Sequence, residues 1–412
     1  MQLTTSVTRP RAQFVKRLGQ CVKVLAVLGL VGAPAVADVL PDDRADVLYH
    51  NYDGGGITIQ GPSVLVRKKA GDHVSFFGSY YEDLISSASI DVKLSASPYH
   101  ETRKQEGGGF DILHDKTIYT VGYIHSREPD YEANTAYYSI SQTMFGDLTT
   151  VSFGYRRGWD NVYRDIKSNG VIMNDPAFHQ QADHRAYSLS LSQILTRNAI
   201  LGLNWETVTD QGYLQSPYRE ILYVNPTNAQ DFATGPQVYP NTRTSSAASA
   251  TFKYYLPYHA AVGGQYRFYN DTWGITGNTV ELNYTQPTFE HRIWGGSLVF
   301  DGSLRFYKQN HANFYSDEFP RADYQNFMAR DRELASFNSY SLGFGAEYEF
   351  PHYSWAPWMN KSSITLHFNR LMINYLDFHN ELYTKYNGTP FAADPLYHLD
   401  ASIVQLFISV WY

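Results

Sequence analysis

The chain has 412 residues, and its 40 acidic and 33 basic side chains give a net charge of −7 at pH 7. This modest negative charge, without a basic stripe, argues against nucleic-acid binding. Aromatic residues are abundant, with 34 Tyr, 23 Phe and 7 Trp, yet the mean hydropathy is −0.38. That combination is typical of a transmembrane barrel, whose strands face lipid on one side and a polar lumen on the other.

The first 37 residues have the pattern of a secretory signal peptide. A positively charged start precedes an apolar run over 24–33, and Ala35-Val36-Ala37 matches a cleavage site. We therefore predict a signal peptide over 1–37, cleavage after Ala37 and export of a chain that begins at Asp38. The apolar run is too short for a transmembrane helix, and no later stretch is long and apolar enough. Cys21, the single cysteine, leaves with the signal, which excludes disulfides, thiolate metal sites and covalent haem.

Alternation of apolar and polar residues recurs along the mature chain. In the clearest segment, 340–350, Tyr340, Leu342 and Phe344 alternate with Ser341 and Gly343. Similar segments occur at 187–192, 201–206, 251–256, 265–268 and 300–306. About ten residues are enough for a tilted strand to cross a bilayer, and strand residues point alternately to opposite faces. No stretch has convincing helical periodicity.

The connections between these segments alternate between short and long. Short turns are predicted near 70–72, 114–115, 146–147, 197–198, 257–259, 288–291 and 351–361, and longer polar segments near 86–99, 126–134, 160–183, 213–243, 271–278, 308–334 and 379–399. Loops of twenty to thirty residues are unusual in compact soluble domains. Outer-membrane barrels have short periplasmic turns and long outer loops.

The two ends of the mature chain decide how the barrel closes. If 46–52 is the first strand, turning at 53–56, then the single domain 38–412 has sixteen strands; without it and one neighbour, fourteen remain. The last segment, 404–412, places Val404, Leu406, Ile408, Val410 and Tyr412 on one apolar face. A closed membrane barrel removes the exposed edge of such a strand, whereas the alternative is a buried edge strand of a soluble sandwich. The predicted fold is an all-β, transmembrane, antiparallel up-and-down β-barrel.

Two resemblances accompany this pattern. The C-terminal strand resembles the aromatic signal of bacterial outer-membrane barrels, which implies the barrel-assembly machinery and outer-membrane lipids as partners. Segments 43–50, 52–56, 61–68, 87–92, 113–119, 131–135 and 145–150 together resemble a bacterial family described as a domain of unknown function, number three-five-seven-zero.

The family resemblance covers nearly all of the mature chain. It implies an outer-membrane barrel of a Gram-negative bacterium but supplies no activity. Its relatives are often encoded near thioredoxin-like proteins, a small lipoprotein and a flavin-transferring maturation enzyme. This setting implies a periplasmic, lipoprotein or redox partner.

Charged residues on the polar faces are the candidates for a functional site. The predicted lumen-lining residues are Arg156, Glu206, Lys253, Arg267, Asp301, Arg305, Glu347 and Glu349. They are expected to point inward, because Arg or Lys facing lipid at mid-bilayer costs about 2–4 kcal/mol. Such charges line a selective, water-filled pore or form a hydrated plug. A barrel of about sixteen strands is wide enough for a channel, so the leading hypothesis is a porin-like conduit for small solutes. The alternative is a non-conducting scaffold that docks a periplasmic, lipoprotein or redox partner.

Catalytic and phosphate-binding motifs are weak. His125 and Ser126 invite comparison with outer-membrane phospholipases, but adjacent strand residues point to opposite faces, and no Gly-x-Ser-x-Gly elbow occurs. The glycine runs 54–56 and 107–109 lack the lysine and helix of a phosphate loop. We therefore predict that the protein is not an enzyme and has no cofactor.

Two loop clusters contain residue types that ligate metals. The first contains Asp175, His179, Asp183 and His184, and the second contains His311, Asp317, Glu318 and Asp323. Neither has a fixed ligand spacing, so both are interpreted as solvated polar loops and no metal site is predicted. Residues 330–333 are expected to pair their charges at a rim.

Overall fold

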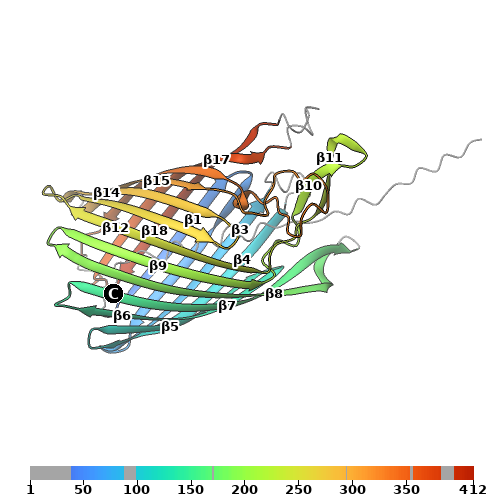
Figure 1. The fold of residues 1–412 in the computed structure, drawn as a ribbon. Helices are drawn as coiled ribbons and strands as arrows, with labels where there is room; N and C mark the ends of the chain where they lie inside the picture. Colours follow the sequence, from blue (N-terminus) through green and yellow to red (C-terminus); the bar gives the residue numbers. More distant parts are fainter. Residues whose placement is uncertain (1–38, 88–98, 169–170, 294, 353–355, 382–393) are drawn as a thin grey trace, which may run out of the picture.

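The computed structural model describes residues 39–87, 99–168, 171–293, 295–352, 356–381 and 394–412. Sixteen strands close into an antiparallel barrel in which β18 pairs with β1 (Figure 1). The barrel strands are β1 (Arg44–Gly54), β2 (Ile57–Lys69), β3 (Val74–Ser87), β4 (Tyr99–His114), β5 (Thr117–Glu128), β6 (Tyr131–Met144), β7 (Thr149–Ser168), β8 (Val171–Thr196), β9 (Ala199–Gly212), β12 (Thr242–Tyr255), β13 (Ala261–Asp271), β14 (Thr276–Ile293), β15 (Gly296–Gln309), β16 (Phe337–Glu349), β17 (Lys361–His379) and β18 (Leu396–Trp411). The prediction of sixteen strands is confirmed, and the alternative of fourteen is wrong. The predicted signal peptide and its cleavage after Ala37 lie outside the described residues.

The first and last strands close the sheet through a continuous register. Tyr49 of β1 faces Leu406 of β18 on one side and Pro62 of β2 on the other. The β1–β2 turn uses Gly55 and Gly56, whose φ angles of 60° and 76° favour residues without a Cβ. β1 is therefore longer than the predicted strand 46–52 and pairs along its whole length.

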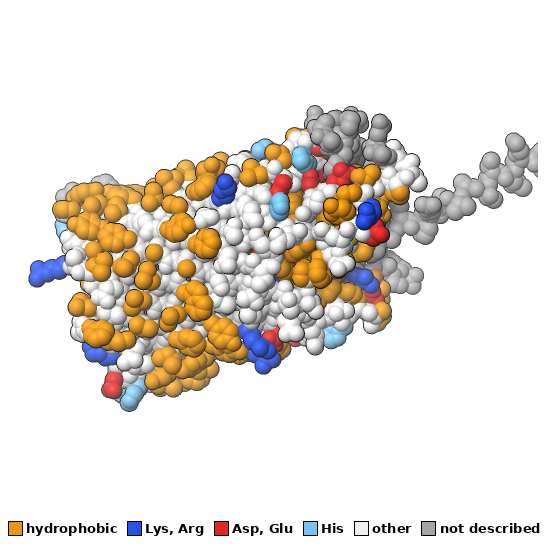
Figure 2. All heavy atoms as spheres, in the orientation of Figure 1, with side chains coloured by type: hydrophobic (Ala, Val, Ile, Leu, Met, Phe, Trp, Pro, Cys, Tyr) orange, Lys and Arg blue, Asp and Glu red, His pale blue; other side chains and the backbone are white. Residues whose placement is uncertain are grey.

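The outer face of the barrel is apolar. On β16, Leu342 and Phe344 are 55% and 56% exposed, and Leu304 of β15 and Leu366 of β17 are similarly exposed. Hydrophobic side chains are spread over the visible wall in Figure 2, whereas most visible acidic side chains gather at the right-hand end. Among the described residues, no helix has the length and apolarity to cross a membrane.

Short connections, such as those at 115–116 and 197–198, join strands at one end of the barrel, here called the turn end. The opposite end, on the right in Figure 1, is called the loop end. There, the β9–β12 connection contains a hairpin of β10 (Glu220–Asn225) and β11 (Asn228–Pro236), and the β15–β16 connection contains a short 3-10 helix, η1 (Arg332–Leu334).

Four predicted connections differ from the structure. The expected loop 126–134 is a tight turn at Pro129 and Asp130 between β5 and β6, and the expected loop 271–278 is a short turn at 272–275 between β13 and β14. The expected loop 160–183 is a continuation of β7 and β8, which project as a hairpin in Figure 1. Backbone pairing, including Asn161 opposite Gln181, keeps these polar segments in strand form without an apolar face. The expected turn at 288–291 lies within β14, which continues to Ile293.

Candidate functional site at the loop end of the barrel

Two connections at the loop end form one structural unit, called the loop block, which comprises residues 213–241 and 310–336. Their backbones bond directly: Val224 N–H donates to Phe319, and the amides and carbonyls of Val238 and Met328 bond reciprocally at 2.9 Å. Ile221, Phe319 and Met328 form a small core between them. These contacts fix the two connections to each other.

The loop block packs against the inner side of β13, β17 and β18 through an aromatic core. Trp273, Tyr239 and Phe314 meet edge to face, with ring centroids 5.2–5.3 Å apart, the geometry that aromatic pairs prefer. The buried members of this core are Tyr239, Trp273, Ile275, Ala312, Phe314, Tyr315, Ala329, Leu334, Ala335, Tyr375, Phe378, Leu399 and Ala401. This part of the loop end is called the packed side.

Buried ion pairs reinforce the loop block. Asp331 accepts hydrogen bonds from the Tyr239 hydroxyl and from Gln237 Nε2 at 3.1 Å, and it pairs with Arg219 at 2.5 Å. Burial raises the pKa of Asp331, and the charge of Arg219 opposes this effect. Arg330 pairs with Asp317 at 2.9 Å. The segment 330–333 does pair its charges, but Arg330, Asp331 and Arg332 are buried.

The strands β1 and β3–β9 form the polar side of the same end. His50 Nε2 lies 2.8 Å from Asp83 Oδ1, and Tyr81 stacks on the His50 ring. Arg103 Nε donates to Ser126 at 3.2 Å and lies 3.8 Å from Glu128. His50, Asp83, Arg103 and Ser126 are all buried. Charge, rather than apolar packing, therefore characterises this side.

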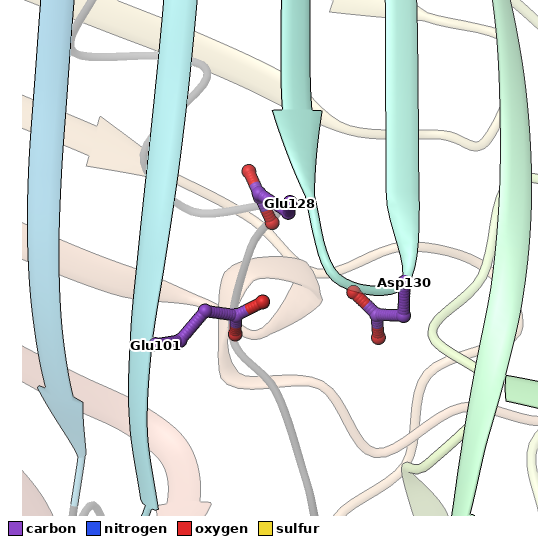
Figure 3. Close-up of side chains that lie close together, drawn as sticks. All are labelled: Glu101, Glu128 and Asp130. Atoms are coloured by element: carbon purple, nitrogen blue, oxygen red, sulfur yellow. The ribbon is translucent and has the colours of Figure 1, made fainter. Parts of the chain in front are cut away.

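Three carboxylates converge on the polar side. Oxygens of Glu101, Glu128 and Asp130 lie within 4.8 Å of one another, and Figure 3 shows the side chains approaching from β4, β5 and the β5–β6 turn. Asp130 also accepts a 2.7 Å hydrogen bond from the Tyr218 hydroxyl, which connects it to the loop block. The amino-acid sequence does not reveal this group, because its members lie on separate elements. Each carboxylate makes further interactions, and Arg103 neutralises part of the charge.

The eight predicted lumen-lining residues all lie on barrel strands. Exposed apolar residues lie next in sequence to four of them, Glu206, Lys253, Arg267 and Arg305. The side chains of these four therefore occupy the opposite, inner face. Arg156 lies on β7, Glu206 on β9, Lys253 on β12, Arg267 on β13, Asp301 and Arg305 on β15, and Glu347 and Glu349 on β16. Their role in lining an open pore stays a prediction.

Register and ion pairs bring only some of these lumen residues together. Glu281 of β14 lies opposite Arg305, and Arg267 is near enough to act on Arg305 electrostatically. Asp301 lies 3.6 Å from His367, and Glu349 pairs with Lys361 at 2.7 Å. The predicted set is thus a series of local groups distributed around the wall.

The first candidate metal cluster is not assembled. His179 and Asp183 share one face of β8, whereas His184 points to the other. His184 Nδ1 lies 2.7 Å from Asp210, His179 bonds Asn161 at 3.2 Å, and Asp183 pairs with Arg157 at 3.1 Å. Asp175 pairs with Arg164.

The second candidate cluster is also dispersed, and the His–Ser pair is separated. His311 pairs with Asp377 at 2.8 Å, and Asp323 with Arg321 at 3.0 Å. Asp317 binds Arg330 and His379, and Ser316 Oγ donates to the Glu318 carbonyl. His125 bonds Asn134 at 3.0 Å, whereas Ser126 accepts from Arg103 on the opposite face.

Comparison with known families identifies the chain. The family model described as "Protein of unknown function (DUF3570)" matches residues 88–357. The chain belongs to this family. The family found by resemblance is therefore confirmed, although the match begins at residue 88 and leaves out the segments 43–50, 52–56 and 61–68. The family's description supplies no activity. No curated protein matches the sequence.

Several solved structures are distantly similar to this family member. A bacterial polysaccharide outer membrane secretin has a TM-score of 0.48 at 8% identity and covers 90% of this chain and 100% of its own. Pseudomonas aeruginosa OccK3 (OpdO) has a TM-score of 0.36 at 11% identity, with 89% and 95% covered. A P. aeruginosa FadL homologue has a TM-score of 0.38 at 10% identity, with 92% and 93% covered. These likenesses are too distant to support a function, and the barrel assignment stands on the strand pairing.

Proposed function

We propose that this protein is a passive conduit for small polar solutes across the outer membrane of a Gram-negative bacterium, narrowed at one mouth by the loop block. The membrane location is supported by the exposed apolar outer face and by the absence of an open sheet edge in the described barrel. Only such closed barrels or helices satisfy their backbones in lipid. The loop end would face outward and the turn end the periplasm. Assembly would proceed through recognition of β18.

The small, polar inner wall is the observation that carries this proposal. Inner positions on neighbouring strands are occupied by residues such as Gly154, Ser188, Gly202, Asn204 and Thr251, which alternate with exposed apolar residues. Bulky apolar side chains would be needed to fill a sixteen-stranded barrel, whereas small polar ones leave room for water. Charges such as Lys253 and Arg267 would then select among solutes.

The loop block would set the size of the aperture. It is fastened to the packed side by an aromatic core and touches the polar side through Tyr218, whose hydroxyl bonds Asp130 and the Asp165 amide at 2.7 Å. Solutes would pass along the charged, polar side of the mouth. The proposal contains no catalytic step, since His125 and Ser126 point to opposite faces.

Single-channel conductance in planar bilayers tests this function. The wild type is compared with a variant in which 311–334 is replaced by a short Gly-Ser linker, and heat-modifiable migration on gels verifies that both barrels are closed. We expect discrete channels in the wild type and a several-fold larger conductance in the variant. Two intact but silent barrels would refute the conduit.

A second candidate is a non-conducting scaffold, which the aromatic core at the mouth favours. In this case the loop block would close the lumen and the loop end or turn end would hold a periplasmic or lipidated partner. Co-purification of such a partner with an intact, electrically silent barrel would support the scaffold over the conduit.

A further inference from the structure

The outer wall of the barrel has two opposed pairs of cationic side chains on the strands β4–β8. Lys104 of β4 lies directly opposite Arg127 of β5, and Arg157 of β7 lies directly opposite Arg185 of β8. All four residues are exposed, and together they are called the basic patch. Like charges directly opposite each other destabilise a strand pair, so an anion bound from outside the barrel would remove an unfavourable interaction.

The strand pattern places the basic patch on the outer face, beside exposed aromatic rings. Tyr123, Trp159 and Tyr187 share strand faces with three of the cations and are 45%, 40% and 39% exposed. Tyr123 of β5 and Trp159 of β7 meet across β6, with ring centroids 6.2 Å apart. Exposed Tyr and Trp gather where a membrane protein meets the lipid headgroups. The basic patch therefore lies at headgroup level.

The height of the basic patch on the barrel agrees with this position. Counted from the turn end, Arg157 lies eight residues along β7 from Thr149, and Arg127 lies ten residues along β5 from Thr117. At about 3.4 Å per residue and a tilt of about 40°, these lengths correspond to roughly 20–28 Å along the barrel axis. The apolar band of an outer-membrane barrel is about 25 Å tall. The cations therefore lie where this band ends on the side of the loop end.

Asp183 neutralises only part of the charge on β7 and β8. Its Oδ2 lies 3.1 Å from Arg157 Nη2, and its Oδ1 lies 3.0 Å from Arg185 Nε. One carboxylate thus serves two guanidinium groups, and the trio has a net charge of +1. The side chains of Arg157 and Arg185 remain 53% and 49% exposed, so both can bind a further anion.

Lys104 and Arg127 have carboxylates opposite them but no ion pair. Glu82 lies opposite Lys104, and Glu132 lies opposite Arg127. The Tyr80 hydroxyl donates to the Glu82 carboxylate at 2.6 Å. Among the described residues, neither Lys104 nor Arg127 forms an ion pair. Their donors are therefore also available to a ligand that approaches from the membrane.

We propose that the basic patch binds the phosphate groups of a phosphorylated glycolipid in the outer leaflet of the outer membrane. Three of the four cations are Arg, whose planar guanidinium binds phosphate through two parallel hydrogen bonds. Basic clusters beside a membrane-spanning surface recognise anionic headgroups. The two cation pairs lie on separate strand pairs of an apolar wall, so a ligand with several phosphates and an apolar body fits them better than a free ion. The inference rests on the membrane location and orientation in the proposed function but not on conduction.

Native mass spectrometry of the detergent-purified, delipidated full barrel tests the basic patch. The probe is bisphosphorylated lipid A, and it is compared with dephosphorylated lipid A and with phosphatidylglycerol. We expect saturable binding of lipid A by the wild type and at least fivefold weaker binding by Arg127→Gln. Lys308→Gln is the matched control, because Lys308 is exposed on the outer face of β15 opposite Asn278 and Asn338. It removes the same charge where no second cation is opposed.

The outcomes separate a headgroup site from general attraction. Displacement of lipid A by millimolar inorganic phosphate, equal binding of phosphatidylglycerol, or equal weakening in both variants would each overturn the proposal. A conducting barrel that does not bind lipid A would refute this inference alone, whereas a silent barrel that binds it would refute only the conduit. The wild-type comparison of phosphorylated and dephosphorylated lipid A is decisive even if Arg127→Gln does not form a closed barrel.

Discussion

The packed and polar sides of the loop end stabilise the same mouth by different physics. On the packed side, Trp273, Phe314 and Phe378 exclude water, and apolar burial of this kind is non-directional and strong. On the polar side, His50, Asp83 and Arg103 depend on specific hydrogen bonds and charge contacts. The two sides therefore have different roles. The packed side holds the loop block in place, and the polar side offers the charged surface along which a solute would move.

Phe378→Ala should have the largest effect of the variants considered. A small effect would contradict the role of apolar packing in holding the loop block. Phe378 is 0% exposed, and the Arg330 guanidinium lies 4.3 Å from its ring centroid. Truncation of a buried Phe costs about 3–5 kcal/mol, so the loop block should detach more often. Limited proteolysis within 310–336 should accelerate by at least tenfold. Phe145→Ala is the control, because Phe145 is 74% exposed at the turn end; equal acceleration in both would contradict the role of the packed side.

The barrel wall provides the next test, because its two faces differ as strongly as the two sides of the mouth. Leu189 of β8 is 48% exposed on the outer face, and Leu189→Arg should destabilise the barrel by about 2–4 kcal/mol if it lies near mid-bilayer. Ser190→Arg, one residue later on the inner face, should cost much less. Urea titration of the barrel folded in liposomes measures both, and equal losses would show that the outer face does not contact lipid.

The wall was accessible to sequence analysis because its residues alternate with a strict period of two. Leu342 and Phe344 were correctly placed on one face by that rule alone, and the sixteen-strand count follows from repeating it. The β7–β8 hairpin was missed because Asn161 and Gln181 pair through their backbones without an apolar face to reveal them. The contacts at the mouth were not predictable either, because the residues that meet there, such as Tyr239 and Asp331, are far apart in the sequence.

Tyr239→Phe should weaken the packed side by a smaller amount. The hydroxyl of Tyr239 donates to the buried Asp331, and hydrogen bonds to charged groups contribute about 1.5–3 kcal/mol. Arg219 and Gln237 remain as partners of Asp331, so the loop block should stay attached while its amides open more often. Hydrogen exchange measures this: protection at Ala329 and Met328 should fall, whereas protection on β5 should not change. Unchanged protection at Ala329 and Met328, as on β5, would show that Asp331 does not need the Tyr239 hydroxyl as a donor.

Lys253→Glu should have the smallest effect on stability. It tests the ion selectivity of the lumen separately from the stability of the barrel. Lys253 is exposed on the inner face of β12, so its replacement should alter the free energy of unfolding by no more than about 0.5 kcal/mol. If the lumen conducts, the reversal potential in a KCl gradient should shift toward cation preference. Lys308→Glu is the matched control. Lys308 is exposed on the outer face of β15, whereas its neighbour Tyr307 faces inward, and the replacement makes the same change in net charge. A shift of equal size in both variants would assign the effect to overall charge, and a shift in Lys253→Glu alone would place Lys253 on the path of the ions.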